Sequence, residues 1–346
     1  MKTLAAILVE QRHPLEIAEI TLPEELDYGQ LRVRLLASGI CGSQLGEIDG
    51  VKGPDAHLPH LLGHEGLAVV EAVGRGVSTV AVDDRVVLHW RKGAGIEAPT
   101  PRYTWDGRTV KAGWVTTFNH RAVVSENRAT RVPSETSPAL GALLGCALTT
   151  GFGAVGHDAG VRPGEALLVF GAGGVGLSAV IAGALTHAYP IIAVDPVVHK
   201  LELARRFGAH VILDPGRDNL AAALARVLGK HGADAVIETT GKPQAIESAY
   251  EFTSKSGRTV LVGVPPVGAK ASLHTLPLHF EQRLLGSHGG GCEPSRDIPR
   301  YLGLANRGAF DPIPMIDHRC TLSEINGAIA SLRSGEATKC LVTFGE

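Results

Sequence analysis

The sequence predicts an α/β protein built from a β-rich region and a doubly wound parallel sheet. The first third alternates apolar and polar residues in short segments bounded by glycine and proline, which is typical of half-buried strands. The middle of the chain alternates apolar strands with helical segments, which is typical of a parallel sheet with crossover helices. A length of 346 residues favours two domains, at roughly 150 residues each.

The first expected strands come from this period of two. Within residues 31–39, Leu31, Val33 and Leu35 alternate with arginines. Similar segments predict strands at 4–9, 66–74, 84–88 and 120–124. Because no helical periodicity of useful length occurs before Pro138, we expect an all-β region, either a small barrel or a folded sheet.

The character of the sequence changes after about residue 147. Residues 166–170 form a continuous apolar run, which indicates a strand covered on both faces. Strict alternation with helices then predicts right-handed crossovers in one sheet. We expect further strands at 191–195, 210–214, 233–238 and 257–263, and helices at 174–188, 200–208, 219–229 and 243–252. From about 288 to 346, we expect two helical segments and a last strand at 340–344.

Composition excludes several classes of protein. Lys and Arg total 33 and Asp and Glu total 35, so a net charge of −2 argues against nucleic-acid and membrane-surface partners. No apolar run approaches the roughly 20 residues of a membrane span, and the apolar start of the chain lacks a cleavage site. Five widely spaced cysteines do not form a disulfide framework, which fits a reducing compartment. We therefore expect a soluble, cytoplasmic protein.

A glycine-rich turn at 171–176 predicts a dinucleotide site. The sequence Gly-Ala-Gly-Gly-Val-Gly follows a buried strand and opens a helix, so its pattern is more specific than glycines alone. Gly171 permits the turn, Gly173 lets backbone N–H groups approach a pyrophosphate, and Gly176 lets the helix pack closely on the sheet. Gly174 and Val175 complete the turn. The alternative is a plain strand–turn–helix corner.

Asp195 predicts which dinucleotide binds. It ends the next strand, 19 residues beyond Gly176, where a carboxylate accepts hydrogen bonds from the adenosine ribose. Its charge would repel a 2′-phosphate, and no arginine occurs in the next four residues. The sequence therefore favours NAD over NADP. An aspartate that starts the next helix, ahead of Pro196, is compatible with the same role.

Cys41, His64 and Cys146 are candidate metal ligands. Two thiolates and an imidazole suit Zn²⁺ and leave a fourth position open, as in catalytic sites. Taken singly, each cysteine could be a small core residue and the histidine a hydrogen-bonded one. The spacing alone does not decide between these readings.

Four motifs, GICGS, GHEG, GCALTTG and GAGGVG, occur in the order and at the separations found in zinc-dependent medium-chain alcohol dehydrogenases. Segments 260–266, 293–299 and 332–344 extend the resemblance over essentially the whole chain. It implies a GroES-like catalytic domain formed by 1–146 and 288–346, with an NAD-binding Rossmann domain at 147–287 inserted between them.

The resemblance also implies individual roles. Cys41, His64 and Cys146 resemble the catalytic zinc ligands, Ser43 the hydroxyl that binds the substrate oxygen, and Glu65 the carboxylate that can approach the metal during ligand exchange. Cofactor contacts are implied for five further residues: Thr150, Lys200, Val262, Val264 and Lys339.

Three departures from the family pattern are informative. No cysteine lies between His64 and Cys146, so we expect one catalytic zinc and no structural zinc. Gln44 stands in place of a common acidic residue, which predicts less negative surroundings for the metal. Gly46 stands where some relatives carry a proton-relay histidine, so another route must take the proton from Ser43.

The resemblance implies a reversible oxidation of an alcohol, polyol or sugar-type substrate by NAD, giving an aldehyde or ketone, in a homodimer or homotetramer. Trp90, Trp114 and Phe118 could narrow the substrate pocket or simply pack in the fold. Two alternatives are a metal-free NADPH reductase of quinones or enones and a noncatalytic NAD-binding protein. The three intact candidate ligands and Asp195 oppose the NADPH reductase, and the intact Ser43 and Glu65 oppose the noncatalytic protein.

Overall fold

The computed structural model describes residues 1–345, which divide into two compact units. Unit 1 contains Met1–Cys146 and the chain from Glu293 onward, and unit 2 contains Ala147–Cys292. The first division follows Cys146, and the domain boundary predicted from the sequence is at 146. The second follows Cys292, a few residues after the boundary expected at 287.

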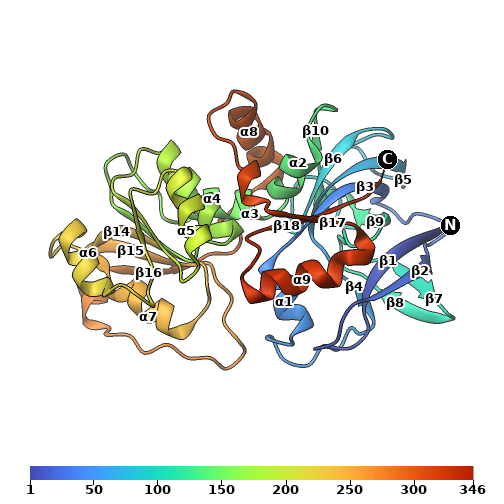
Figure 1. Ribbon diagram of the computed structural model, residues 1–346. Coiled ribbons are helices and arrows are strands. Elements are labelled where there is room, and N and C mark those ends of the chain that lie inside the picture. Colours follow the sequence, from blue (N-terminus) through green and yellow to red (C-terminus); the bar gives the residue numbers. More distant parts are fainter. Residues whose placement is uncertain (346) are drawn as a thin grey trace. The chain divides into compact units, whose positions relative to one another are not determined.

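Unit 1 combines a closed barrel with a larger, mostly antiparallel sheet (Figure 1). The barrel runs in the order β1 (Lys2–Leu8), β2 (Glu16–Thr21), β7 (Arg102–Trp105), β8 (Arg108–Lys111) and β4 (His60–Leu61). The sheet runs in the order β10 (Ala129–Val132), β6 (Arg85–His89), β5 (Glu65–Val73), β3 (Gln30–Ile40), β18 (Cys340–Thr343) and β17 (His318–Cys320), with β9 (Arg121–Ser125) also paired to β3.

Strand β3 organises this unit. Its apolar positions, Leu31, Val33 and Leu35, are fully buried in one core cluster, while the arginines between them are partly exposed. On one side β3 pairs with β5, and on the other with β18, whose register places Cys340 opposite Ile40. Residues near the end of the chain therefore extend the sheet that β3 begins, and Figure 1 shows the red β18 beside the blue β3.

The helices of unit 1 are short and lie around this sheet. They are α1 (Gly42–Ile48), α2 (Pro138–Leu144), α8 (Pro294–Asn306) and α9 (Ile325–Ser334), with 3-10 turns η1 (Glu126–Arg128), η4 (Ile313–Met315) and η5 (Leu322–Glu324). Helix α1 lies before Pro138, where no helix was expected. It has seven residues, including Gly42 and Gly46, so it is too short to show periodicity and its glycines disfavour a helix.

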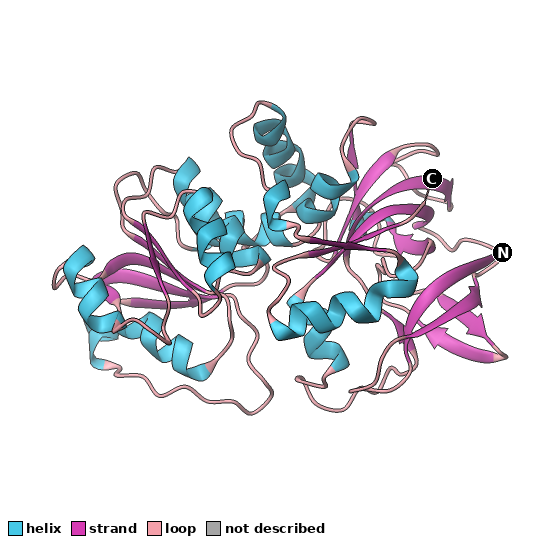
Figure 2. Ribbon diagram, viewed as in Figure 1, coloured by secondary structure: helices cyan, strands magenta, loops and turns pink. Residues whose placement is uncertain are grey.

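Unit 2 is a parallel sheet with helices on both faces (Figure 2). The strand order is β13 (Val211–Leu213), β12 (Ile191–Val194), β11 (Leu167–Phe170), β14 (Ala233–Glu238), β15 (Thr253–Leu261) and β16 (Arg283–Gly286), and every pairing is parallel. The helices and turns are α3 (Ala147–Gly153), η2 (Ala154–Asp158), α4 (Gly174–Leu185), α5 (Val198–Arg206), α6 (Leu220–Leu228), α7 (Pro243–Glu251) and η3 (Leu276–Phe280).

This strand order reverses direction between β11 and β14, and β11 is buried along its whole length. A reversal of this kind leaves a crevice at the carboxyl ends of the strands, where open α/β sheets bind their ligands. The glycine-rich turn follows β11 directly, so the predicted dinucleotide motif lies at that place in the sheet.

No single helix within residues 1–345 is long and apolar enough to cross a membrane, although the consecutive helical segments Pro138–Leu144 and Ala147–Asp158 pass a length and composition test when taken together.

Candidate functional site

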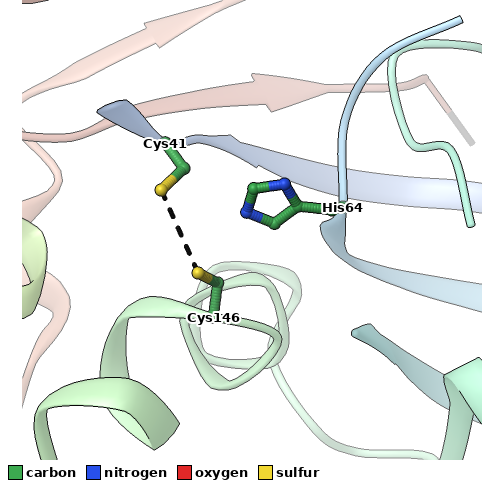
Figure 3. A group of neighbouring side chains, drawn as sticks. All are labelled: Cys41, His64 and Cys146. Carbon is green, nitrogen blue, oxygen red and sulfur yellow. Dashed lines mark hydrogen bonds between the residues drawn. The ribbon is translucent and has the colours of Figure 1, made fainter. Parts of the chain in front are cut away.

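Three side chains from distant parts of the sequence meet in unit 1. Cys41 follows β3, His64 precedes β5, and Cys146 follows α2. Their ligand atoms all lie within 4.8 Å of one another, and the two sulfurs are 4.0 Å apart. Figure 3 shows both sulfurs and one ring nitrogen of His64 facing a common point.

The dimensions of this group fit zinc. Two sulfurs at ~2.3 Å from a tetrahedral zinc ion are separated by about 3.8 Å, close to the separation observed here. The Nε2 atom of His64 is buried and has no hydrogen-bond partner among residues 1–345. A buried ring nitrogen without a partner is unfavourable, and a metal ion at the common point would satisfy it. Both the donor set and the geometry therefore suit Zn²⁺.

The two cysteines shift each other's pKa in opposite directions. A hydrogen bond from the Cys146 thiol holds the pKa of Cys41 well below its ordinary value, although burial opposes this, and His64 and Lys339 add to the effect. The same hydrogen bond, together with burial, raises the pKa of Cys146 well above its ordinary value. The Cys41 thiol therefore gives up its proton more readily than the Cys146 thiol does.

Ser43 lies in the first turn of α1, two residues after Cys41. Its Oγ atom is buried and unpartnered within the described chain. A hydroxyl can both donate and accept, and this one has an unused capacity for both. The structure therefore leaves Ser43 free to hydrogen-bond an added oxygen.

Glu65 and Lys339 form a buried ion pair beside the cysteines. Glu65 is fully buried, and its Oε1 atom accepts a short hydrogen bond from Lys339 Nζ, which also donates to the backbone oxygen of Ile40 at 3.1 Å. Gly39 makes room for the carboxylate, since a Cβ there would lie 2.7 Å from Glu65 Oε1. The Oε2 atom of Glu65 has no partner in the part of the chain that the structure describes.

This placement differs from the expectation that Lys339 contacts a pyrophosphate. The Lys339 residue is 3% exposed, and its ammonium group is already neutralised by Glu65. Burial acts to lower the pKa of Lys339, but attraction to Glu65 and to the cysteines raises it overall, so the ammonium stays charged. Its charge acts on the metal site within unit 1.

The glycine-rich turn in unit 2 has the space and the close contacts that a dinucleotide site requires. Gly171 has a φ of +90°, which favours glycine, and a Cβ at Gly176 would lie 1.8 Å from the backbone oxygen of Gly171. At Gly173, by contrast, a Cβ would meet nothing within 4 Å. Gly171 and Gly176 thus make the turn possible, while Gly173 leaves open space at the N-terminus of α4, where an anion binds favourably.

Asp195 links this turn to the following helix. Its two carboxylate oxygens accept hydrogen bonds from the backbone N–H groups of Ala172 at 2.7 Å and Val197 at 2.9 Å. Each oxygen keeps a further lone pair for a ribose hydroxyl. Of the remaining expected cofactor residues in unit 2, Thr150 is buried in α3, Lys200 is partly exposed in α5, and Val262 and Val264 follow β15.

The segment between β6 and β7, which carries no cysteine, is held by hydrogen bonds to the turn at 125–128. Glu126 Oε2 accepts a hydrogen bond from the backbone N–H of Ile96. Its Oε1 atom accepts three, from the N–H and the hydroxyl of Thr79 and from the N–H of Ser78. Ser125 Oγ accepts from the N–H of Ala98. The bonds to Ile96 and Ala98 fix the backbone of this segment, and those to Ser78 and Thr79 tie the same turn to the loop between β5 and β6.

Replacing the charge of Glu126 is expected to destabilise unit 1. Burial acts to raise the pKa of Glu126, but the hydrogen bonds to Ser78, Ile96 and Thr79 lower it overall. Glu126→Gln turns one acceptor into a donor, so at least one partly buried N–H loses its charged partner, and we expect a loss of about 1.5–3 kcal/mol in unfolding free energy. Urea unfolding of both proteins at pH 7 measures this loss of unfolding free energy.

The pH dependence follows from the same shift. A carboxyl whose pKa is lowered by folding stabilises the protein above its unfolded value of 4.5, and this stability is lost as pH falls through the lower folded value. The difference between wild type and Glu126→Gln should therefore shrink in acid. Glu97→Gln, which changes an exposed partner of Arg128 in the same segment, serves as control and should have little effect.

Several aromatic and basic residues have structural contacts. Phe118 is fully buried in the core of unit 1, so it packs in the fold. Trp114 is half exposed and lies under the guanidinium of Arg128, 5.2 Å from its ring centroid. His60 uses both ring nitrogens, one with Asp55 at 2.8 Å and the other with the backbone oxygen of Leu61 at 3.0 Å.

Comparisons with known proteins agree with this fold and site. Residues 27–134 match the family described as alcohol dehydrogenase GroES-like domain, and residues 174–307 match the family described as zinc-binding dehydrogenase. Alcohol dehydrogenase 6 of Peromyscus maniculatus is 30% identical, over 98% of this chain and 96% of that protein. S-(hydroxymethyl)glutathione dehydrogenase of Escherichia coli O6:H1 is 29% identical, over 99% of this chain and 100% of that protein.

A solved structure shows the same architecture. The alcohol dehydrogenase zinc-binding domain protein from Burkholderia ambifaria superimposes with a TM-score of 0.92 at 29% identity, and each chain is covered completely, at 100%. The fold and the similarity to known enzymes define an oxidoreductase of the alcohol dehydrogenase type. The chain belongs to the zinc-dependent medium-chain alcohol dehydrogenase family, which confirms the resemblance and the fold class predicted from the sequence.

Proposed function

We propose that this chain is a zinc- and NAD-dependent dehydrogenase that converts primary or secondary alcohols, polyols or sugar-type alcohols reversibly into aldehydes or ketones. The observation that carries the proposal is the convergence of Cys41, His64 and Cys146, with His64 Nε2 buried and unpartnered among the described residues. Three protein ligands leave a fourth position for substrate. Zinc held there would act as a Lewis acid toward the substrate oxygen.

The residues around this site would have separate roles in the reaction. Ser43 Oγ, buried and without a partner in residues 1–345, would accept a hydrogen bond from the alcohol hydroxyl and relay its proton. The Glu65 carboxylate, held by Lys339, supplies negative charge next to the ligands, and its Oε2 atom is available during ligand exchange. The reaction removes this proton and a hydride from the alcohol, and yields the carbonyl product, NADH and a free proton.

Binding of NAD would fall to unit 2. The N-terminus of α4 and the turn at 171–176 would take the pyrophosphate, and Asp195 the adenosine ribose. Thr150, Val262 and Val264 would contact the nicotinamide and Lys200 the ribose, on the basis of the family resemblance. The two alternatives fit less well, because a metal-free reductase or a noncatalytic protein gives no reason for an unpartnered ring nitrogen facing two cysteine sulfurs.

The test of this function combines metal analysis with turnover. Protein refolded or expressed with zinc should contain one zinc per chain and should reduce NAD⁺ when a panel of alcohols, polyols, cyclitols and sugar derivatives is supplied. A content of one zinc per chain, and not two, is expected because we propose that hydrogen bonds hold the segment between β6 and β7 without a structural metal. Protein that binds NAD but takes up no zinc and turns over no alcohol would contradict the proposal.

Removing the Asp195 charge is expected to change the choice of cofactor. Loss of two ribose hydrogen bonds to a charged acceptor weakens NAD binding by about 10- to 100-fold, while loss of repulsion favours NADP. The ratio of kcat/KM for NAD⁺ and NADP⁺ in Asp195→Ala measures the change. Asp195→Asn is the size-matched second variant: it removes the charge, keeps one acceptor for Ala172 or Val197 and turns the other oxygen into a donor. An unchanged ratio in both variants refutes the assigned role.

A homo-oligomer, dimer or tetramer, is also part of the proposal. Strand β16 has β15 as its partner in the described sheet and lies at its edge. The preceding segment exposes Val264, Val267, Leu276 and Phe280, each by more than half. An open strand edge beside apolar side chains favours pairing with a second copy. The five widely spaced cysteines support a reducing cellular compartment.

A further inference from the structure

The side-chain amide of Gln44 lies between two of the metal-ligand residues. Gln44 is 1% exposed and belongs to the first turn of α1. Its Oε1 atom accepts a hydrogen bond from the backbone N–H of Cys41 at 2.9 Å, and its Nε2 atom forms a short contact with Nδ1 of His64. The amide thus touches the backbone of one ligand residue and the ring of another.

In this arrangement the His64 ring proton is on Nε2. The NH₂ group of Gln44 donates, so Nδ1 of His64 must accept, and a neutral imidazole then carries its proton on the other nitrogen. That nitrogen, Nε2, faces the two cysteine sulfurs (Figure 3) and has no partner within the described residues. With the Gln44 amide in this orientation, Nδ1 of His64 therefore accepts a hydrogen bond and carries no proton.

Zinc binding requires the opposite arrangement. A neutral histidine that ligates through Nε2 carries its proton on Nδ1, which must then donate to a carboxylate, a carbonyl or water. Gln44 can accept from Nδ1–H only if its amide turns over, which removes the acceptor from the N–H of Cys41 and places a donor there. One amide oxygen cannot serve both donors, whereas the two oxygens of a carboxylate can.

We propose that Gln44 couples zinc binding to a change of His64 tautomer and a turn of its own amide, so that this centre holds zinc less tightly than a carboxylate at position 44 would allow. The inference rests on the zinc site proposed above. Gln44 acts as a positioning residue through His64 and Cys41. The result is a metal centre that exchanges its ion readily while keeping the ligand set of a catalytic site.

Zinc release tests the proposal without relying on activity. Zinc-loaded wild type, Gln44→Glu and Gln44→Met are mixed with a chromophoric chelator, and the release rate is followed. Partners of metal-ligating histidines commonly change metal affinity by about 10- to 100-fold, so we expect Gln44→Glu to release zinc at least about tenfold more slowly. Gln44→Met, of similar size but without an acceptor, should release zinc as fast as wild type or faster.

A charge control separates this effect from general electrostatics. Gln11 donates from Nε2 to the backbone oxygens of Glu47, in α1, and of Gly53, so Gln11→Glu adds the same charge beside the helix through a residue with no hydrogen bond to His64. Its release rate should match wild type. If Gln11→Glu slows release as much as Gln44→Glu does, the proposed hydrogen-bond mechanism is wrong.

Nitrogen NMR of the histidine ring reads the tautomer directly. The His64 signals, assigned by their loss in His64→Ala, should show an unprotonated Nδ1 in metal-free wild type and a protonated Nδ1 after zinc is added. An Nδ1 with the same protonation in both states overturns the proposal, as does equal zinc release by wild type and Gln44→Glu. Wild-type protein that takes up no zinc instead refutes the proposed function, and the two failures are therefore distinguishable.

Discussion

We expect Cys41→Ser and His64→Ala each to abolish zinc binding and alcohol turnover and to leave NAD binding nearly unchanged. A serine hydroxyl is a poor replacement for a thiolate ligand, and alanine leaves no ligand atom. Because a metal Lewis acid contributes several kcal/mol to the stabilisation of developing charge, we expect kcat to fall by about 10³-fold or more. NAD binding is spared because residues 171–195 belong to unit 2, which is compact without these residues.

Two measurements on the same preparations check this result. Metal analysis gives the zinc content per chain, and titration of the protein with NADH gives its dissociation constant. Cys320→Ala is the matched control, since Cys320 is also a buried cysteine of unit 1 but belongs to the core cluster and not to the metal group. Full turnover by a variant that contains no zinc would falsify the mechanism.

The sequence predicted the fold where the periodicity of the pattern matched the burial of the strand. In β3 the alternation of Leu31, Val33 and Leu35 with arginines became the alternation of buried and partly exposed positions. In β11 the continuous apolar run became a strand buried at every position. Burial on one face and on both faces leaves different patterns in the sequence, so both parts of the fold were predictable.

Elements that depend on long-range pairing were not predictable. Strand β4 has two residues, and it exists because His60 and Leu61 pair with β1 and His60 also pairs with Lys111 of β8. Helix α1 exists although two of its seven residues are glycines, because Cys41 and Gln44 cap its first turn reciprocally. Neither element has a local pattern long enough to indicate it.

The same distinction applies to the candidate site. The residue types of Cys41, His64 and Cys146 made them candidate metal ligands, and the family resemblance, rather than their spacing, supplied the grouping that the structure displays. The burial of Lys339 had no such signal, because a lysine is almost always exposed unless paired and its partner, Glu65, lies 274 residues away. The hydrogen bond between Gln44 and His64 likewise depends on which strand and helix ends the fold brings together.

The buried ion pair of Glu65 and Lys339 predicts the second large effect. Lys339→Met removes the ammonium group and leaves the Glu65 carboxylate enclosed, with its side chain fully buried. Removing one partner of a buried pair typically costs about 3–5 kcal/mol, and we expect a loss of this size in the unfolding free energy of the zinc-loaded protein at pH 8. The exposed pair of Lys2 and Glu19 supplies the control, and Lys2→Met should change stability little.

The pH dependence of this loss identifies its cause. Burial raises the pKa of Glu65 despite the attraction of Lys339, so without the lysine the folded pKa should rise further above its unfolded value of 4.5. A carboxyl with a raised folded pKa loses stability as pH increases from the unfolded to the folded value. Lys339→Met should therefore be less destabilised at pH 5 than at pH 8, and adding Glu65→Gln should remove this dependence. A pH-independent loss in the single variant would instead point to lost packing of the lysine side chain, with the carboxylate uninvolved.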